Sequence, residues 1–557
     1  MIAIQDGPES FIAEAVGSMM AGHERRVFRS CDELVWRGVK RQFQGKEPLV
    51  HGQYACELIA QSIAALNDRI RRVVRRRSSL HWLWMLRRLP SSVFEGELAT
   101  TLGYDQTLAE AATGTAREAD DVMFGPDLVA TFSLDEVTLS DLAELCSLVR
   151  FVSDLHKAYR WAAKGAGLRF GPCARPAEIA NTELRSSVEL YDQRVVASSR
   201  PLSRQGSEVV RASDVIGEPG TLLRVVPTLP SEVRLSPDLL GKLTIEHPEL
   251  NRVGARVAAR FTLQRVAVPR LLSLNPSLSP KELAVILLLH TAALHVHRHR
   301  SGLFSVMTRG YLLVETTILR DMMSEFMAIG GDELNARLVQ VGMLNVHQLW
   351  EMLRRVRGTM WPLVPGPVIR ECGRWTCLDL ASATKHLDVL EADDGFGEIA
   401  NTRADHFEHA VQAMIDASSW KPSDGLKALR GRPLKLKGNT ITDLDAVGAR
   451  GSTLLAVSCK STVYRRTYDQ GDHSTVRNVA SLVQKAVAEW SQRMGTLEAA
   501  PVGDNYDLSH YSGILRVICL PMVPWVPLGA ATADVADGLR AACSYSEFAS
   551  WLTNAFP

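Results

Sequence analysis

The 557-residue chain lacks several patterns that would place it at once in a common enzyme class. Neither the phosphate loop Gly-x-x-x-x-Gly-Lys nor the nucleophile motif Gly-x-Ser-x-Gly occurs, which disfavours an ATP-driven motor and an α/β-hydrolase. No Cys-x-x-Cys pair occurs among the nine cysteines, so a structural zinc site is not expected. Most of these cysteines lie inside apolar runs, which is typical of core residues in a reducing compartment.

Signals for export and membrane insertion are also missing. The N-terminus has no basic segment followed by an apolar core, so no signal peptide is expected. The most apolar window, residues 283–294, has about half the length that a helix needs to cross a bilayer. The formal net charge is only +1, which excludes a uniformly basic nucleic-acid coat but leaves room for local basic surfaces. We therefore expect a soluble, cytoplasmic protein without a membrane partner.

The chain divides into four expected regions. Apolar residues at three- and four-residue spacing predict α-helical modules over 1–170 and 271–360, and glycine, proline and β-branched runs predict a small mixed α/β region over 171–270. Three prolines and a glycine interrupt the pattern just after residue 360, so the last boundary is expected there. An α/β domain over 361–557 completes a multidomain fold whose N-terminal and middle regions are mainly α.

Two local patterns support these assignments. Ser279 and Pro280 have the residue types of an N-cap and a first helical turn, and Ser140 or Asp141 is a candidate N-cap for a helix over 139–151. In the C-terminal domain the predicted elements alternate between helix and strand. They are a helix over 403–418, a strand over 440–447, a turn over 448–451, a strand over 453–458, a helix over 476–494, a strand over 513–520 and a helix over 546–554.

Charged side chains stand in two of these predicted strands. Asp443 and Asp445 are two positions apart and share one face, as do Ser458 and Lys460 beyond the turn. Two carboxylates suit a hard divalent cation, and a neighbouring lysine can orient water and neutralise charge that builds on a transition state. Taken singly, the same residues also fit a solvated strand end and a lysine that protects a sheet edge.

The order of these residues resembles the restriction-endonuclease-like PD-(D/E)XK nuclease superfamily over the C-terminal third of the chain. In that family a helix glutamate precedes an acid in one strand, and an acid-x-lysine triplet closes the next strand. Glu408, Asp445 and Lys460 match these positions, which implies Mg²⁺ or Mn²⁺ as cofactor with Asp445, Glu408 or Asp443 as ligands. The triplet here is Ser458-Cys459-Lys460, so a serine replaces the expected acid and weakens the metal site.

Basic and polar residues supply candidate contacts to nucleic acid. A run of arginines would form a cationic stripe on a helix, which attracts phosphates, although such runs also serve as solvated faces. Further candidates follow the strand that ends at Lys460 and lie on the next helix. The candidates are Arg71, Arg72, Arg75, Arg76, Arg465, Arg466, Arg477 and Gln484.

These observations predict a metal-dependent endonuclease that acts on DNA more readily than on RNA, with defence against foreign nucleic acid as a setting by analogy. The helical modules would select the target or bind a protein partner. Two alternatives remain open at this point. One is a catalytically inactive nuclease-like subunit that binds nucleic acid or assembles with other proteins, and the other is a helical scaffold whose last domain is α/β by coincidence.

Overall fold

The computed structural model describes most of the chain between Gly7 and Asn554. The residues outside the description are 1–6, 45, 47, 90–103, 117–122, 125–129, 133–134, 171–176, 179–180, 198–207, 210–220, 235–255, 275–277, 300–301, 330–332, 361–362, 391–397, 462–467, 469–470 and 555–557.

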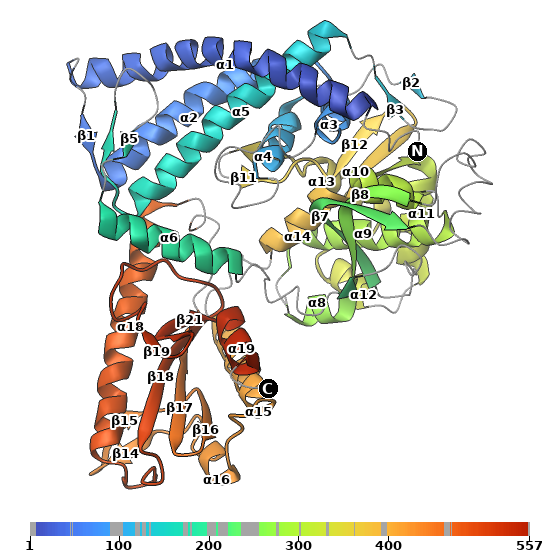
Figure 1. Cartoon of the computed structure of the whole chain (residues 1–557). Helices are drawn as coiled ribbons and strands as arrows, with labels where there is room; N and C mark the ends of the chain where they lie inside the picture. The colour runs from blue at the N-terminus through green and yellow to red at the C-terminus, as the bar shows by residue number, and fades with distance from the viewer. Residues whose placement is uncertain are drawn as a thin grey trace.

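The N-terminal region is helical, as expected. Its three long helices pack along one another, α5 against both α1 and α2 (Figure 1). The elements are α1 (Gly7–Gln42), β1 (Leu49–Val50), α2 (Gly52–Val74), α3 (Ser79–Leu86), α4 (Tyr104–Ala112), η2 (Thr113–Thr115), β2 (Met123–Phe124), β3 (Ala130–Thr131), α5 (Glu136–Ala163), β4 (Leu168–Arg169), β5 (Ala177–Glu178) and α6 (Thr182–Ala197).

The start of α5 corrects the N-cap prediction. The helix is capped by Asp135, whose side chain accepts a hydrogen bond from the N–H of Thr138, and not by Ser140 or Asp141. Asp141 lies inside the helix, where it forms ion pairs of 2.8 Å with Arg76 and with Arg77. Its charge therefore holds α5 against the end of α2.

The middle region combines a long hairpin with helices. The apolar face of the β7–β8 hairpin packs on α9, and β13 pairs with both β9 and β12. The elements are β6 (Glu208–Val209), β7 (Thr221–Arg234), β8 (Arg256–Ala267), α8 (Val268–Leu274), α9 (Pro280–Arg298), α10 (Gly302–Arg309), β9 (Tyr311–Glu315), α11 (Thr316–Ile329), α12 (Glu333–Gln340), α13 (Val346–Arg354), β10 (Thr359–Met360), β11 (Leu363–Val364), β12 (Ile369–Cys372), β13 (Trp375–Asp379) and α14 (Leu380–Leu390).

The N-terminus of α9 confirms its predicted cap. Ser279 is the N-cap, Pro280 is the first helical residue, and Glu282 closes a capping box. No described helix combines the length and the apolar character needed to cross a bilayer.

Packing and strand pairing cross two of the expected domain boundaries. Residues of β7 and β8 such as Val225 and Leu263 share one apolar core with Leu287 of α9, so no break in packing falls at 270. Beyond residue 361, β12 and β13 do not join the C-terminal sheet, because β13 pairs with β9 of the middle region. The middle region therefore continues through α14, and the C-terminal domain begins with α15. Pro365, Gly366 and Pro367 lie in the segment between β11 and β12.

The C-terminal domain is built on a four-stranded sheet with the order β16-β17-β18-β21. β16 runs antiparallel to β17, and β17, β18 and β21 run parallel to one another. The elements are α15 (Glu398–Asp416), α16 (Asp424–Lys427), β14 (Leu434–Leu436), β15 (Asn439–Thr442), β16 (Ala446–Arg450), β17 (Thr453–Cys459), α18 (His473–Ala499), β18 (Gly513–Leu520), β19 (Asp534–Ala536), β20 (Leu539–Arg540), β21 (Ala542–Ser544) and α19 (Tyr545–Asn554).

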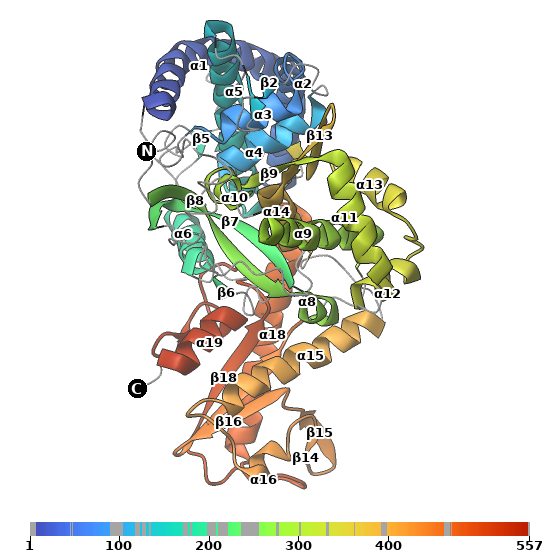
Figure 2. The ribbon, with the colours of Figure 1, turned by 90° about the vertical axis from the view of Figure 1, so that its right-hand side faces the viewer.

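Helices cover both faces of this sheet. Alternate residues of a strand point to opposite faces, and accordingly Leu454 and Ala456 of β17 belong to the apolar cluster that includes α18, whereas Leu455 and Val457 belong to the cluster of α15 and α19. Figures 1 and 2 show α18 on one side and α15 and α19 on the other. The domain is a three-layer α/β unit, with α18 as the crossover between the parallel strands β17 and β18.

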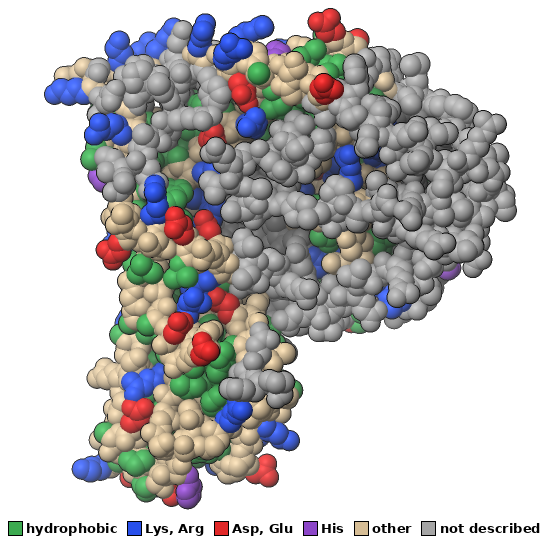
Figure 3. Space-filling view, in the orientation of Figure 1, with side chains coloured by type: hydrophobic (Ala, Val, Ile, Leu, Met, Phe, Trp, Pro, Cys, Tyr) green, Lys and Arg blue, Asp and Glu red, His purple; other side chains and the backbone are tan. Residues whose placement is uncertain are grey.

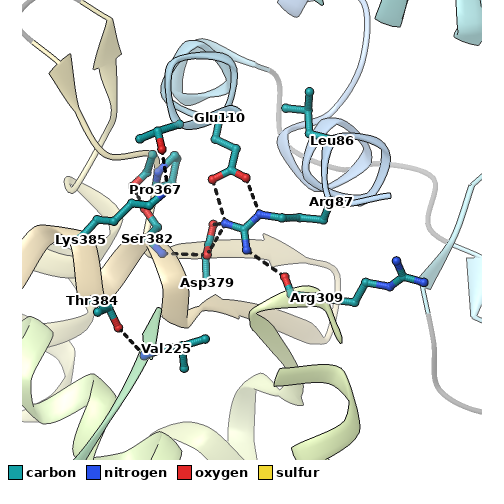
Figure 4. A network of polar contacts seen from close by, with 12 residues as sticks. Leu86, Arg87, Glu110, Val225, Arg309, Pro367, Asp379, Ser382, Thr384 and Lys385 are labelled. Atoms are coloured by element: carbon teal, nitrogen blue, oxygen red, sulfur yellow. Dashed lines mark hydrogen bonds and ion pairs between the residues drawn. The ribbon is translucent and has the colours of Figure 1, made fainter. Parts of the chain in front are cut away.

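A buried ion network joins the N-terminal helices to the middle region (Figure 4). The Arg87 guanidinium lies between the carboxylates of Glu110 and Asp379, and it also donates to the carbonyl oxygen of Arg309 at 2.9 Å. A second arginine, Arg370, donates to Asp379 at 2.9 Å. Burial acts to lower the pKa of Arg87, but Asp379 and Glu110 outweigh that effect and raise it. Two cations and two anions thus compensate one another where four elements meet.

Candidate functional site

The sequence-predicted strand over 440–447 is two strands in the structure. β15 ends at Thr442 and β16 begins at Ala446, so the segment between them does not follow the alternation of one strand. Asp443 is exposed, whereas Asp445 is partly buried. The prediction that these two side chains share a strand face is therefore wrong. The expected turn is also shorter, because β16 extends to Arg450.

Asp445 is held in place by backbone and side-chain contacts. Its Oδ2 accepts hydrogen bonds from the N–H of Cys459 at 2.7 Å and from the hydroxyl of Ser458 at 3.1 Å. Its carbonyl oxygen accepts a bond from Nε of Arg430 at 3.1 Å. The register that places Ala446 opposite Val457 brings Asp445 to the end of β17. The serine in the position of the expected acid therefore orients the carboxylate on the neighbouring strand.

Lys460 follows β17 directly and lies beside this carboxylate. Burial raises the pKa of Asp445, while the hydrogen bond from Cys459 and the positive charge of Lys460 act to lower it. The ammonium group of Lys460 forms no ion pair with any residue that the structure describes. Because the backbone N–H of Lys460 donates to the carbonyl oxygen of Cys519 at 2.9 Å, the residue is anchored while its amine is left available.

Glu408 reaches the same place from α15. Burial raises the pKa of this carboxyl group, the negative charges of Asp445, Asp405 and Asp443 raise it further, and Arg430 acts in the opposite sense. Glu408, on a helix, is therefore within electrostatic range of Asp445, on an interstrand segment, and Asp445 is within range of Lys460, at a strand end. Asp443 is exposed, and its negative charge raises the pKa of both Glu408 and Asp445.

Gln412, which sequence reasoning missed, fixes α15 against the sheet. Its side-chain amide accepts from the N–H of Val447 at 2.9 Å and donates to the carbonyl oxygen of the same residue at 3.0 Å. Glu408 lies one helical turn before Gln412 on α15. The two hydrogen bonds between Gln412 and Val447 therefore fix the position of Glu408 relative to β16. The available signal was a polar residue within the apolar stripe that contains Phe407, Val411 and Ile415.

The donor set fits an open cation site and not a closed one. Within the described part of the chain, no three histidine, cysteine or acidic side chains converge in a way that would hold a metal. Mg²⁺ is commonly held by only one or two carboxylates, with waters and phosphate oxygens completing its coordination. Glu408 and Asp445 would supply two such groups, and a cation near both would offset the mutual repulsion that contributes to the raised pKa of Glu408.

Only some of the arginines at the end of α2 are available to contact phosphates. Arg76 forms ion pairs with Asp141 and Glu144, at 2.8 and 2.9 Å, so it supports the packing of α5. Arg71, Arg72 and Arg75 are exposed. Trp82 and Trp84, which follow this run, are buried in the core, which excludes stacking on bases.

Other cationic side chains lie on α1, a position that the sequence analysis did not single out. Figure 3 shows Lys and Arg side chains along the upper edge of the molecule, over α1. Those of the helix that are exposed are Arg25, Arg26, Arg29, Arg37, Lys40 and Arg41.

The remaining candidates belong to α18 and the segment before it. Arg477 and Gln484 are exposed on α18, on the layer opposite to α15. Arg465 and Arg466 lie outside the described residues.

Comparison with known proteins adds no assignment. No protein-family model matches this sequence, and no solved structure matches the chain.

Proposed function

We propose that the C-terminal domain is a metal-dependent nuclease that hydrolyses phosphodiester bonds, in DNA more readily than in RNA. The observation that carries the proposal is the meeting of Glu408, Asp445 and Lys460 at one end of the sheet, with Asp445 oriented by Ser458 and Cys459. The same three residues carry the resemblance to the PD-(D/E)XK superfamily, although they are spread over 53 positions in the sequence.

Each residue has a chemical role that follows from its surroundings. Asp445 is partly buried and held by two hydrogen bonds, which suits a fixed ligand. The amine of Lys460, on a residue whose backbone is anchored, would stabilise negative charge on the phosphoryl oxygens. Glu408 has a raised pKa, so it accepts and releases a proton more readily than an ordinary exposed glutamate would. A bound Mg²⁺ or Mn²⁺ would supply Lewis acidity and a more acidic water.

The test is a cleavage assay on the full chain with single- and double-stranded DNA and RNA, with Mg²⁺, with Mn²⁺ and with EDTA. We expect metal-dependent cleavage that falls by about a hundredfold or more in Lys460→Ala and in Asp445→Asn, as for the loss of a group that stabilises transition-state charge. Lys485→Ala is the matched control, since this lysine is exposed on α18 and its side-chain exposure is 77%.

The outcome that contradicts the proposal is equal cleavage by the wild type and Lys460→Ala, which would indicate a contaminating nuclease. Cleavage that persists in EDTA would exclude the metal-dependent mechanism.

A second candidate function is a nuclease-like domain that binds nucleic acid without cleaving it. Ser458 stands where the family has an acid, and no third ligand converges on the site among the described residues. Under this alternative all variants are inactive, yet Lys460→Ala weakens binding of an oligonucleotide in a filter or fluorescence assay. Restoring an acid with Ser458→Asp would then create metal-dependent cleavage only if the rest of the machinery is intact.

A further inference from the structure

A cavity of about 340 Å³ opens between the N-terminal helices and the middle region, well separated in sequence from the acidic site of the C-terminal domain. Its walls come from the start of α3, the η2 turn, the end of α13 and strand β12. Its volume lies at the lower end of the range of small-molecule pockets, which is about 300–1,000 Å³. The cavity therefore suits a ligand the size of a mononucleotide.

Arg370 is a rigid, buried cation in the wall of this cavity. Only 2% of its side chain is exposed. Its Nε donates to the hydroxyl of Ser79 at 2.9 Å, and its Nη1 donates to the carbonyl oxygen of Pro367 and to Asp379, each at 2.9 Å. The third nitrogen, Nη2, is buried and has no hydrogen-bond partner among the described residues. A buried guanidinium donor without an acceptor is costly. The fixed positive charge of this side chain lies directly behind the wall of the cavity.

The rest of the lining is also cationic. Among the described residues, four arginines line the cavity against two glutamates, and both glutamates are already engaged by Arg354, at 3.2 Å for Glu351 and 3.1 Å for Glu371. Arg355 and Arg357 are exposed and form no ion pair within the described chain. These two side chains are therefore available to a ligand.

Two further features favour a phosphate over other anions. Ser79 and Leu80, the first residues of α3, line the cavity, and the amides of a first helical turn lack intrahelical acceptors and attract phosphate oxygens. Arginine forks match the geometry of phosphate bidentately. Leu80, Ala116, Pro367 and Ile369 add apolar wall, which gives the uncharged part of the ligand a surface to contact.

We propose that this cavity binds a small phosphate-bearing molecule, such as a nucleotide, with its phosphate on Arg355 and Arg357 and the buried charge of Arg370 behind them. The site is independent of the nuclease proposal. Ligand bound here touches both the N-terminal helices and the middle region, and so it would stabilise the junction that the Arg87 network forms.

The test is isothermal titration of the full chain with inorganic phosphate, AMP, ATP and adenosine. We expect the phosphorylated compounds to bind and adenosine to fail. The double variant Arg355→Ala/Arg357→Ala should weaken binding by about tenfold or more through lost charge-assisted hydrogen bonds. Lys485→Ala/Arg493→Ala, which removes two exposed cations from α18, is the control and should bind as the wild type does.

A second variant separates a shaped site from general electrostatic attraction. Ala116→Phe fills the cavity without changing its charge, so it should abolish binding, with circular dichroism showing an intact fold. The proposal is overturned if the wild type binds none of the phosphates, or if Ala116→Phe binds them unchanged. It is also overturned if the arginine double variant loses affinity for a DNA oligonucleotide but keeps its affinity for nucleotides. Arg355 and Arg357 would then contact a nucleic-acid chain and not a small ligand.

Discussion

The side-chain amide of Gln412 pairs with both backbone polar groups of Val447, at 2.9 and 3.0 Å. β16 is the edge strand of the sheet, so Gln412 takes the place of a neighbouring strand at this residue. Because the amide is on α15, it ties the helix that carries Glu408 to the strand that follows Asp445. The candidate site therefore depends on a side chain that has no chemical role of its own.

Gln412→Leu should destabilise the protein and disturb the site. The change leaves the N–H and the carbonyl of Val447 without their partners, which costs about 2–6 kcal/mol by the usual penalty for two buried unsatisfied groups. Denaturant unfolding measures the loss of stability, and cleavage or oligonucleotide binding at a temperature where the variant is folded measures the displacement of Glu408. Gln492→Leu on the exposed side of α18 is the control. Unchanged stability would show that the amide pair is not formed.

Asp445→Asn should separate function from stability. The raised pKa of Asp445 means that its protonated form is favoured in the folded state, so this group stabilises the fold at low pH and the stabilisation is lost as the pH rises through its folded pKa. Asparagine keeps an acceptor for Ser458 and Cys459 without the charge. The stability of the variant relative to the wild type should therefore increase as the pH is raised above about 4, the ordinary pKa of an aspartate. Urea unfolding from pH 3 to 8 tests this, with the exposed Asp443→Asn as control. A pH-independent difference would refute it.

Arg87→Met should be among the most damaging single changes. It leaves Glu110 and Asp379 as buried carboxylates with one fewer cation, and breaking such a buried pair costs about 3–5 kcal/mol. Thermal and chemical unfolding of the full chain measure the loss. Arg71→Met, an exposed arginine of α2 paired only with Asp68 on its own helix, should cost less than about 1 kcal/mol. Similar losses for both variants would contradict the assignment of the network as the junction.

The triple variant Arg71→Ala/Arg72→Ala/Arg75→Ala should bind DNA more weakly without losing stability. These side chains are exposed and form no ion pair with α5 within the described chain, whereas Arg76 is paired with Asp141 and Glu144 of α5. If all three contact phosphates, the slope of log K against log salt concentration should fall in magnitude by about 2–3, at roughly 0.9 per contact with duplex DNA. Fluorescence anisotropy at several salt concentrations measures this slope. An unchanged slope would show that these three arginines do not contact DNA. Arg76→Ala should instead lower the unfolding temperature, because Arg76 forms ion pairs with α5.

The elements whose patterns are local could be predicted from the sequence. β18 has the predicted limits, and β17 differs by one residue, because strands buried on both faces read as continuous apolar runs between turns. α18 is a few residues longer at each end than the predicted helix. Its N-cap, Asp472, lies before the first residue of the apolar repeat from which the helix was predicted.

Features that depend on distant contacts could not be predicted. The break between Thr442 and Ala446 arises because Leu444 and Asp445 bond to Arg430 and Gly431, on a loop after α16. Nothing in the sequence of the segment itself marks this contact. The pairing of β13 with β9 and the cavity beside Arg370 likewise join segments far apart in the chain.

The packing of α18 has a practical consequence for dissecting this protein. The start of α18 lies against the N-terminal helices: His473 approaches Gly52, and Gly471 comes so close to Arg160 that a side chain at Gly471 would clash with it. Val476 and Ala480 belong to the same apolar cluster as α2 and α5. A fragment cut before α15 would leave that surface bare to water and prone to aggregate. Truncation is therefore a poor way to isolate the chemistry of the last domain, and point variants in the intact chain are the sounder route.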